Sequence, residues 1–281
     1  FLSISAELNV LEGQKLLGSI FLLGLFVDID IEKSIHFYSL AANQDDKEAQ
    51  YYLGNIYCEK ELHFDIDKSI HYLTLAAEQN ELDAQYKLGT IYDDGKLIPR
   101  DIEKAIYFYT LASNQNDTRA LSRLGFIYQY GDCVEININK AIQYYTAAAD
   151  LNDPFSQVLL GYLYMDEKTG PFDINKSLHY FSLAANQNVP RAQLAIALFY
   201  LNGHYVTTDI DKGIHYLTLA ANQNNAEAQF LLGIIYNDSE LNKLDIQKSI
   251  YYLTLAANQN HAKAHNKLGS IYIEGIHVLR D

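Results

Sequence analysis

The chain has 281 residues, and its 49% content of hydrophobic residues is ample for burial, which argues against a disordered chain. Acidic residues (35) outnumber Lys and Arg (21), so the formal net charge is −14. Because no run of Lys or Arg offsets this charge, the sequence argues against nucleic acid as a partner.

The first segment, residues 1–25, is partly apolar but is interrupted by Glu7, Glu12 and Lys15. Its Gly18 stands in register with residues that recur along the rest of the chain, namely Gly54, Gly89, Gly125, Gly161, Ala197, Gly233 and Gly269. This register predicts a truncated repeat in residues 1–25, and we expect no signal peptide there.

A second landmark keeps the same period, an Asp/Asn-Ile-x-Lys phrase that leads into a Leu-Ala-Ala-Asn-Gln-like end. Its lysines are 36 residues apart in five intervals and 35 in one, and they are Lys33, Lys68, Lys104, Lys140, Lys176, Lys212 and Lys248. Self-similarity at a fixed period of this size is typical of a solenoid, in which repeats stack in order. We therefore predict a single array over residues 1–281, cut at both ends from a longer protein.

Residues 82–116 illustrate one repeat. Its first half places apolar residues on one face of a helix, at Ala84, Leu88, Ile91 and Tyr92. After Gly95 and a short polar loop, a second helix has its own stripe, formed by Ala105, Phe108, Tyr109 and Ala112. Gly89, inside the first helix, costs about 1 kcal/mol relative to Ala. Its recurrence at this position indicates close approach of the neighbouring helix.

Both ends of the second helix have predicted caps. Asp101 can accept backbone N–H groups at the positive end of the helix. The equivalent residues are Asp30, Asp65, Asn137, Asp173, Asp209 and Asp245. Asn116 lies at the other end, where Asn tolerates the left-handed conformation of a C-terminal cap. We interpret the lysine after each N-cap as a solvated residue. We interpret the recurring Asn-Gln pairs as inter-repeat caps; the second interpretation of these amides is that they bind the backbone of an extended peptide.

The consensus of the repeats is A-x-x-x-L-G-x-x-Y, a loop, and then D-x-x-K-A/S-x-x-Y/F-Y-x-x-A-A-x-Q. This pattern resembles the Sel1-like repeats, relatives of the tetratricopeptide repeat, over nearly the whole chain. The resemblance implies an all-α, right-handed superhelical α-solenoid of stacked helical hairpins. It also implies an adaptor that binds protein or peptide partners, and it supplies no catalytic residues.

Several classes of function lack their sequence signals. Cys58 and Cys133 are the only cysteines, which excludes a disulfide scaffold and, without a signal peptide, favours a cytoplasmic location. No apolar run approaches the roughly 20 residues that span a bilayer. We find no nucleophile elbow, phosphate-binding glycine loop or Cys-x-x-Cys pair, and we expect no catalytic residues and no cofactor. A hydrolase built on such repeats would need cysteine pairs in each unit, which two cysteines do not supply.

Histidines are the only residues whose pattern suggests metal binding. One repeat position holds His36, His71, His179 and His215. Equivalent residues of stacked helices lie roughly 10 Å apart, too far to share an ion whose bonds are about 2.1 Å long. His261 and His265 are one helical turn apart, but no third ligand is evident. We predict no metal site.

The first helix of each repeat has two variable positions, one before the Leu and one after the Gly, that share a face. In the central repeats these positions are almost wholly apolar, and Lys87 and Arg123 lie at the rim. The candidate partner-binding residues, called the first-helix stripe below, are Arg123, Phe126, Leu159, Tyr162, Leu198, Leu231 and Ile234. If exposed, the stripe marks a protein interface. Tight curvature would instead bury it, and the sequence leaves both outcomes open.

We therefore predict a protein–protein interaction scaffold that binds its partners through the concave face of the solenoid. The alternative within the same fold is a regulatory or targeting region of a larger enzyme, such as a protein kinase. The oligomeric state is not set by the sequence.

Overall fold

The structure is a computed structural model that describes residues 10–131, 133–168, 170–203, 205–241 and 243–274. The chain forms two compact units, residues 1–151 and residues 152–281. Part of one expectation, the truncated repeat at 1–25, lies outside the described residues. The single array over residues 1–281 stays a prediction.

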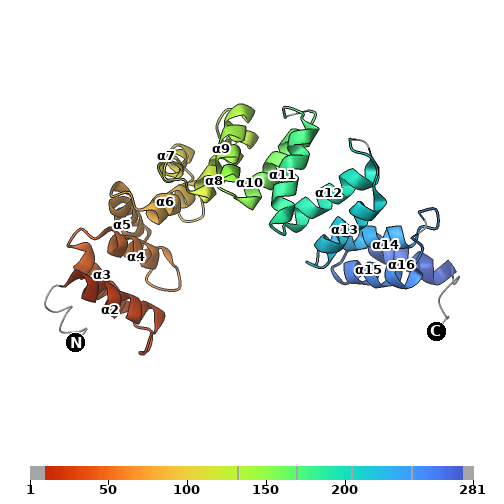
Figure 1. Ribbon diagram of the computed structural model, residues 1–281. Helices are drawn as coiled ribbons and strands as arrows, with labels where there is room; N and C mark the ends of the chain where they lie inside the picture. The colour runs from red at the N-terminus through yellow and green to blue at the C-terminus, as the bar shows by residue number, and fades with distance from the viewer. Residues whose placement is uncertain (1–9, 132, 169, 204, 242, 275–281) are drawn as a thin grey trace. The chain divides into compact units, whose positions relative to one another are not determined.

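The first unit consists of helical hairpins. Within the described residues its helices are α2 (Leu11–Leu23), α3 (Ile31–Ala42), α4 (Lys47–Cys58), α5 (Ile66–Glu78), α6 (Leu82–Asp94), α7 (Ile102–Ser113), α8 (Thr118–Tyr130) and α9 (Ile138–Asp150). Each even-numbered helix packs against the helix that follows it, and α3, α5 and α7 pack against the first helix of the next hairpin (Figure 1). This is the predicted stacking of hairpins.

The second unit follows the same plan. Its described helices are α10 (Pro154–Met165), α11 (Ile174–Asn186), α12 (Pro190–Asn202), α13 (Ile210–Ala221), α14 (Ala226–Tyr236), α15 (Ile246–Asn258) and α16 (Ala262–Glu274). The hairpins are α10–α11, α12–α13 and α14–α15, and the last of them packs against α16. No strand occurs among the described residues of either unit, so the prediction of an all-α array of hairpins is confirmed.

The recurring glycine lies where the two helices of a hairpin approach each other. A Cβ atom added at Gly89 would lie 2.5 Å from Cδ1 of Tyr109, and one at Gly161 would lie 2.7 Å from Cδ1 of Phe181. Both rings are buried. The close approach expected from the sequence is therefore confirmed.

The sixth repeat shows how this contact tolerates a larger residue. Ala197 replaces the glycine there, and Gly213 stands on the second helix where the other repeats have Ser or Ala. In the repeats with serine, its hydroxyl donates to the carbonyl of the facing glycine, as from Ser177 to Gly161 over 2.7 Å. Each helix pair thus has one glycine at this contact. In the sixth repeat the glycine is on the second helix instead of the first.

The predicted caps are present at both ends of the second helices. Asp101 Oδ1 accepts a hydrogen bond from the backbone N–H of Lys104 over 3.1 Å. The same bond recurs at Asp30, Asp65, Asn137, Asp173, Asp209 and Asp245. Asn116 adopts a left-handed φ of 63° directly after α7 and its closing turn. The interpretation of these residues as caps is confirmed.

The interpretation of the lysine that follows each N-cap as a solvated residue is incomplete, because the lysine also contacts an aromatic ring. The Nζ atom of Lys104 lies 5.0 Å from the centroid of the Tyr92 ring on the first helix. Tyr92 in turn stacks on Phe108 of the second helix with centroids 5.8 Å apart. The ammonium group covers a ring in the same way in each of the seven described hairpins. Each lysine therefore ties the two helices of its hairpin together.

Glutamine amides connect successive hairpins. Gln115 Nε2 donates to Gln85 Oε1 over 2.8 Å, and Gln85 Nε2 donates to the Ala77 carbonyl at the end of the preceding hairpin over 3.0 Å. In the fourth repeat both glutamines are replaced together, by Leu121 and Leu151. Joint loss avoids a buried amide without its partner, which would be costly. The predicted inter-repeat capping is confirmed.

The capping carboxylates predict a defined acid sensitivity. Acceptance of the backbone N–H three residues on is the main cause that lowers the pKa of Asp30, Asp65, Asp101, Asp209 and Asp245 from 3.8. A carboxyl whose pKa is lowered on folding stabilises the fold above its unfolded pKa, and this contribution is lost as the pH falls through the folded pKa.

We expect Asp101→Asn to keep its cap at low pH, because Asn caps helices about as well as Asp and cannot lose a charge. The melting temperature, followed by circular dichroism at pH 7 and pH 3, should therefore fall less in Asp101→Asn than in the wild type. Asp67→Asn is the matched control, since Asp67 lies in the first turn of α5 without being its N-cap. Equal falls in the wild type and Asp101→Asn would contradict the assignment.

Candidate functional site

The first-helix stripe is divided between the two units. Arg123 and Phe126 lie on α8 of the first unit and are half-buried. The remaining residues lie in the second unit: Leu159 and Tyr162 on α10, Leu198 on α12, and Leu231 and Ile234 on α14. Tyr162 is 41% exposed and Leu198 36%, and none of the seven side chains is fully buried.

Arg123 takes part in a charge cluster of the first unit. Its Nε donates to Oδ2 of Asp93 over 2.6 Å, and Arg100 Nη2 donates to Oδ1 of the same carboxylate over 2.7 Å. Asp93 is only 3% exposed, and Tyr109 also donates its hydroxyl to it over 3.3 Å. The guanidinium of Arg123 lies 5.2 Å from the centroid of the Phe126 ring. Arg123 thus neutralises a buried charge and links α8 to the preceding hairpin.

In the second unit, α10 and α12 border an apolar groove of about 280 Å³. We call it the α10–α12 groove; its main lining residues are Tyr162, Met165, Leu194, Leu198, Phe199 and Tyr205. Two members of the stripe, Tyr162 and Leu198, are therefore brought together. Leu159 and Leu231 are not among the lining residues.

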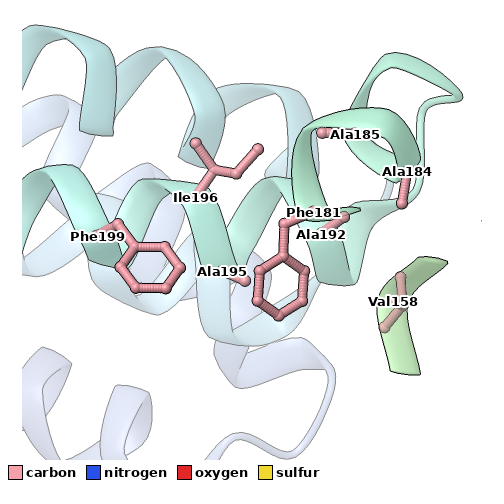
Figure 2. Close-up of a cluster of buried hydrophobic side chains, with 8 residues drawn as sticks. All are labelled: Val158, Phe181, Ala184, Ala185, Ala192, Ala195, Ile196 and Phe199. Atoms are coloured by element: carbon pink, nitrogen blue, oxygen red, sulfur yellow. The ribbon is translucent and has the colours of Figure 1, made fainter. Parts of the chain in front are cut away.

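A buried cluster beneath the groove holds its floor in place. Phe199 is buried, and its ring lies 6.2 Å from that of Phe181, measured between centroids. Figure 2 shows these two rings with Ala195 between them in this view. The edge of the Tyr162 ring contacts Phe181 with a centroid separation of 5.0 Å. The floor and one wall of the groove thus belong to a packed aromatic core.

Tyr205 forms another wall of the groove from the loop after α12. Its ring lies 6.3 Å from Phe199 and 5.7 Å from Phe172, measured between centroids. Its hydroxyl donates to Oε1 of Glu167 over 3.1 Å, and this bond to a carboxylate raises the pKa of Tyr205. The ring contacts and this hydrogen bond fix the position of a side chain that is still 46% exposed.

Sequence reasoning missed Met165, Leu194, Phe199 and Tyr205. It considered only the two positions that vary next to the Leu-Gly landmark. Met165 and Phe199 lie on helices at other positions, and Tyr205 lies in a loop. Leu194 and Phe199 lie in an apolar run near the end of α12, residues 194–201, and this run is the signal that could have found them. Met165 and Tyr205 have no comparable signal.

A second pocket, the α14–α16 pocket, has a volume of about 310 Å³ and a different chemistry. It is lined by Phe230, Ile234, Lys263, Asn266, Lys267 and Ser270. Ile234 is the member of the stripe that lies here. The pocket combines an apolar side from α14 with a polar and basic side from α16.

Within the described residues, no group of three or more His, Cys, Asp or Glu side chains could hold a metal ion. The recurring histidines His36, His71, His179 and His215 are all exposed. His261 Nε2 donates to Oε2 of Glu227 over 2.9 Å, while its Nδ1 accepts from the backbone N–H of Ala264. In the same residues, no helix combines the length and the apolar character needed to cross a bilayer.

Comparison with known proteins agrees with these repeats. The model of the Sel1 repeat family matches residues 11–46, 47–81, 82–117, 118–153, 154–189, 190–225, 226–261 and 262–281. A comparison with curated proteins gave no match.

Two solved structures are similar over almost the whole chain. One is c5321, described as a protective antigen of uropathogenic Escherichia coli with an SLR fold, at 27% identity and a TM-score of 0.84. The alignment covers 97% of this chain and 59% of c5321, so the chain spans about three-fifths of that protein. The other is a Sel1 repeat protein from Oxalobacter formigenes, at 28% identity and a TM-score of 0.82, with 96% of this chain and 78% of that protein covered. On the evidence of consecutive matches from residue 11 to residue 281, the chain belongs to the Sel1 repeat family.

Proposed function

We propose that the chain is a protein-interaction scaffold that takes an apolar segment of a partner protein into the α10–α12 groove. Sel1 repeat proteins are generally interaction scaffolds and are typically non-catalytic. The observation that carries the proposal is the groove itself, because Tyr162, Leu198 and Tyr205 leave a contiguous apolar surface exposed beside a rigid floor. Surfaces of this kind mark protein interaction sites.

The size of the groove favours apolar side chains as its occupants. A cavity of about 150 Å³ holds one benzene molecule, so a volume of about 280 Å³ has room for one or two large apolar side chains. Pockets for drug-sized ligands occupy roughly 300–1,000 Å³. The groove is slightly smaller than that range, which suits anchor residues of a peptide segment.

In this proposal the remaining residues of the first-helix stripe contribute contacts outside the groove. Leu159, Leu231 and Ile234 extend the apolar surface of the second unit beyond the groove. Arg123 and Phe126 form a separate candidate contact in the first unit, where the guanidinium already pairs with Asp93. The comparisons give no support to the alternative of a regulatory region of a kinase.

A selection from a phage-displayed library of random 20-residue peptides tests the proposal without a known partner. We expect enriched peptides whose binding to the wild-type chain weakens about 30-fold or more in Leu198→Asp, the loss expected of an interface hot spot. Tyr162→Ala should weaken binding as well. Its matched control is Tyr251→Ala, which removes an exposed ring from α15 in the same unit.

Circular dichroism melting curves establish that each variant is folded. The proposal fails if the selection yields no peptide that depends on Leu198, or if Tyr162→Ala and Tyr251→Ala weaken binding equally.

A further inference from the structure

Two lysines on α16 form a basic pair at the α14–α16 pocket. Lys263 and Lys267 are one helical turn apart, so their side chains share one face of the helix. Both line the pocket together with Phe230 and Ile234 of α14. Lys263 is exposed and Lys267 is half-buried, so both ammonium groups belong to an accessible surface.

This pair has no ion-pair partner among the described side chains, although the chain has 35 acidic residues. Most other lysines pair with a carboxylate three residues away or on a neighbouring element, as Lys243 does with Asp211 and Lys212 with Asp209. The carboxylate of Glu227 on α14 is already engaged by His261. Two like charges one turn apart destabilise a helix slightly. Nothing described within the chain offsets this repulsion.

The pocket and the α10–α12 groove lie in the same unit, and α12 and α14 line them from successive repeats. Neighbouring packed helices are separated by about 10 Å, so two repeats correspond to roughly 20 Å. A helix of about 13 residues or an extended chain of about 6 residues covers this length. On α14, Ile234 lines the pocket itself, and Leu231, which lines neither site, is half-buried on the same helix. One continuous peptide segment can therefore reach both sites.

We propose that the partner segment carries acidic residues on one side of its apolar anchors, and that these carboxylates bind Lys263 and Lys267 while the anchors occupy the α10–α12 groove. The inference rests on the proposed function and names the chemistry of the partner. Charge complementarity selects carboxylates, because the unpaired charges of the pocket are positive. The apolar residues Phe230 and Ile234 beside the lysines suit a peptide, whose acidic side chains alternate with apolar ones.

The same peptide library, selected in parallel on wild-type chain and on the double variant Lys263→Glu/Lys267→Glu, tests the inference. We expect peptides enriched on the wild type to carry Asp or Glu on one side of an apolar pair, and those enriched on the variant to carry Lys or Arg there. Replacing the acidic residues of one enriched peptide by their amides should weaken its binding to the wild type roughly 5-fold, as expected for two partly exposed ion pairs. Higher salt should reduce this difference.

The double variant Lys60→Glu/Lys96→Glu controls for the change in net charge, since both lysines are exposed in loops of the first unit and neither is one of the recurring lysines. It should leave the acidic preference unchanged. Peptides that need Leu198 but show no charge preference would overturn this inference and leave the proposed function standing. A library without any peptide that depends on Leu198 would overturn both.

Discussion

Replacing Tyr145 by alanine should lower the free energy of unfolding by about 3–5 kcal/mol, the range measured when large aromatic side chains are removed from packed cores. The Tyr145 side chain is 0% exposed, and its ring packs onto the helix surface at Gly125. Burial raises the pKa of Tyr145 above its usual range, so the ring is a neutral phenol at pH 7. Its hydroxyl donates to Oε1 of Gln129 over 2.9 Å, and the substitution removes this bond as well.

Urea denaturation followed by circular dichroism at 222 nm measures the effect. Tyr107→Ala is the matched control, because Tyr107 is 59% exposed on a second helix and should change the stability by no more than about 0.5 kcal/mol. Tyr145→Phe keeps the ring and should cost only about 1 kcal/mol for the lost hydrogen bond. Similar losses for Tyr145→Ala and Tyr107→Ala would show that the ring is not part of the core.

Replacing the recurring glycine by alanine should lower the stability of the chain at Gly125 and raise it at Gly269. At Gly125 a Cβ atom would lie 2.5 Å from Cε1 of Tyr145, a rigid ring that cannot move aside cheaply. Overpacking of this kind costs about 1–3 kcal/mol or more, which exceeds the helix-propensity gain of up to about 1 kcal/mol from Gly to Ala. We therefore expect Gly125→Ala to destabilise the chain.

At Gly269 no described atom lies within 4 Å of the added Cβ atom. Gly269→Ala should then stabilise the chain by up to about 1 kcal/mol through helix propensity alone. The same urea measurement compares both variants. If both substitutions stabilise the chain, close helix packing does not explain why glycine recurs at this position of the repeats.

The sequence predicts most of the fold because the repeated residues act locally. Asp101 caps the helix that it begins, and Asn116 adopts the left-handed conformation that its type tolerates. The glycine at position 89 requires a close neighbour, and Tyr109 is that neighbour. In each case the residue type and its period are enough to infer the feature, although for Gly89 they do not identify Tyr109 as the neighbour.

Contacts between residues far apart in the sequence were not predictable in the same way. The stack of Lys104 on Tyr92 needs the packing of two helices, and the period alone gives no sign of it. The cluster of Arg100 and Arg123 around Asp93 depends on three residues that occur in no other repeat in that combination. A cluster that occurs once, unlike the recurring lysine contact, has no periodic signal.

The candidate site was predicted in part. Period and spacing placed Tyr162 and Leu198 on one face, and both line the groove. The groove itself depends on the sizes of the side chains between the helices, such as Phe199 against Phe181, and on a loop residue, Tyr205. The repeat pattern determines which face of a helix a residue occupies. Whether a groove forms at that face, and how deep it is, depends on the sizes of the surrounding side chains.

Met165 offers the most direct test, because it lines the groove and is the one methionine of the chain. Labelling with ¹³C-methyl methionine gives a spectrum with a single protein methyl resonance at the proposed binding site. Titration with a selected peptide should shift this resonance, with saturation at the same peptide concentration as in a fluorescence anisotropy assay. A peptide that saturates in the anisotropy assay while the Met165 resonance stays unchanged would contradict binding in the groove.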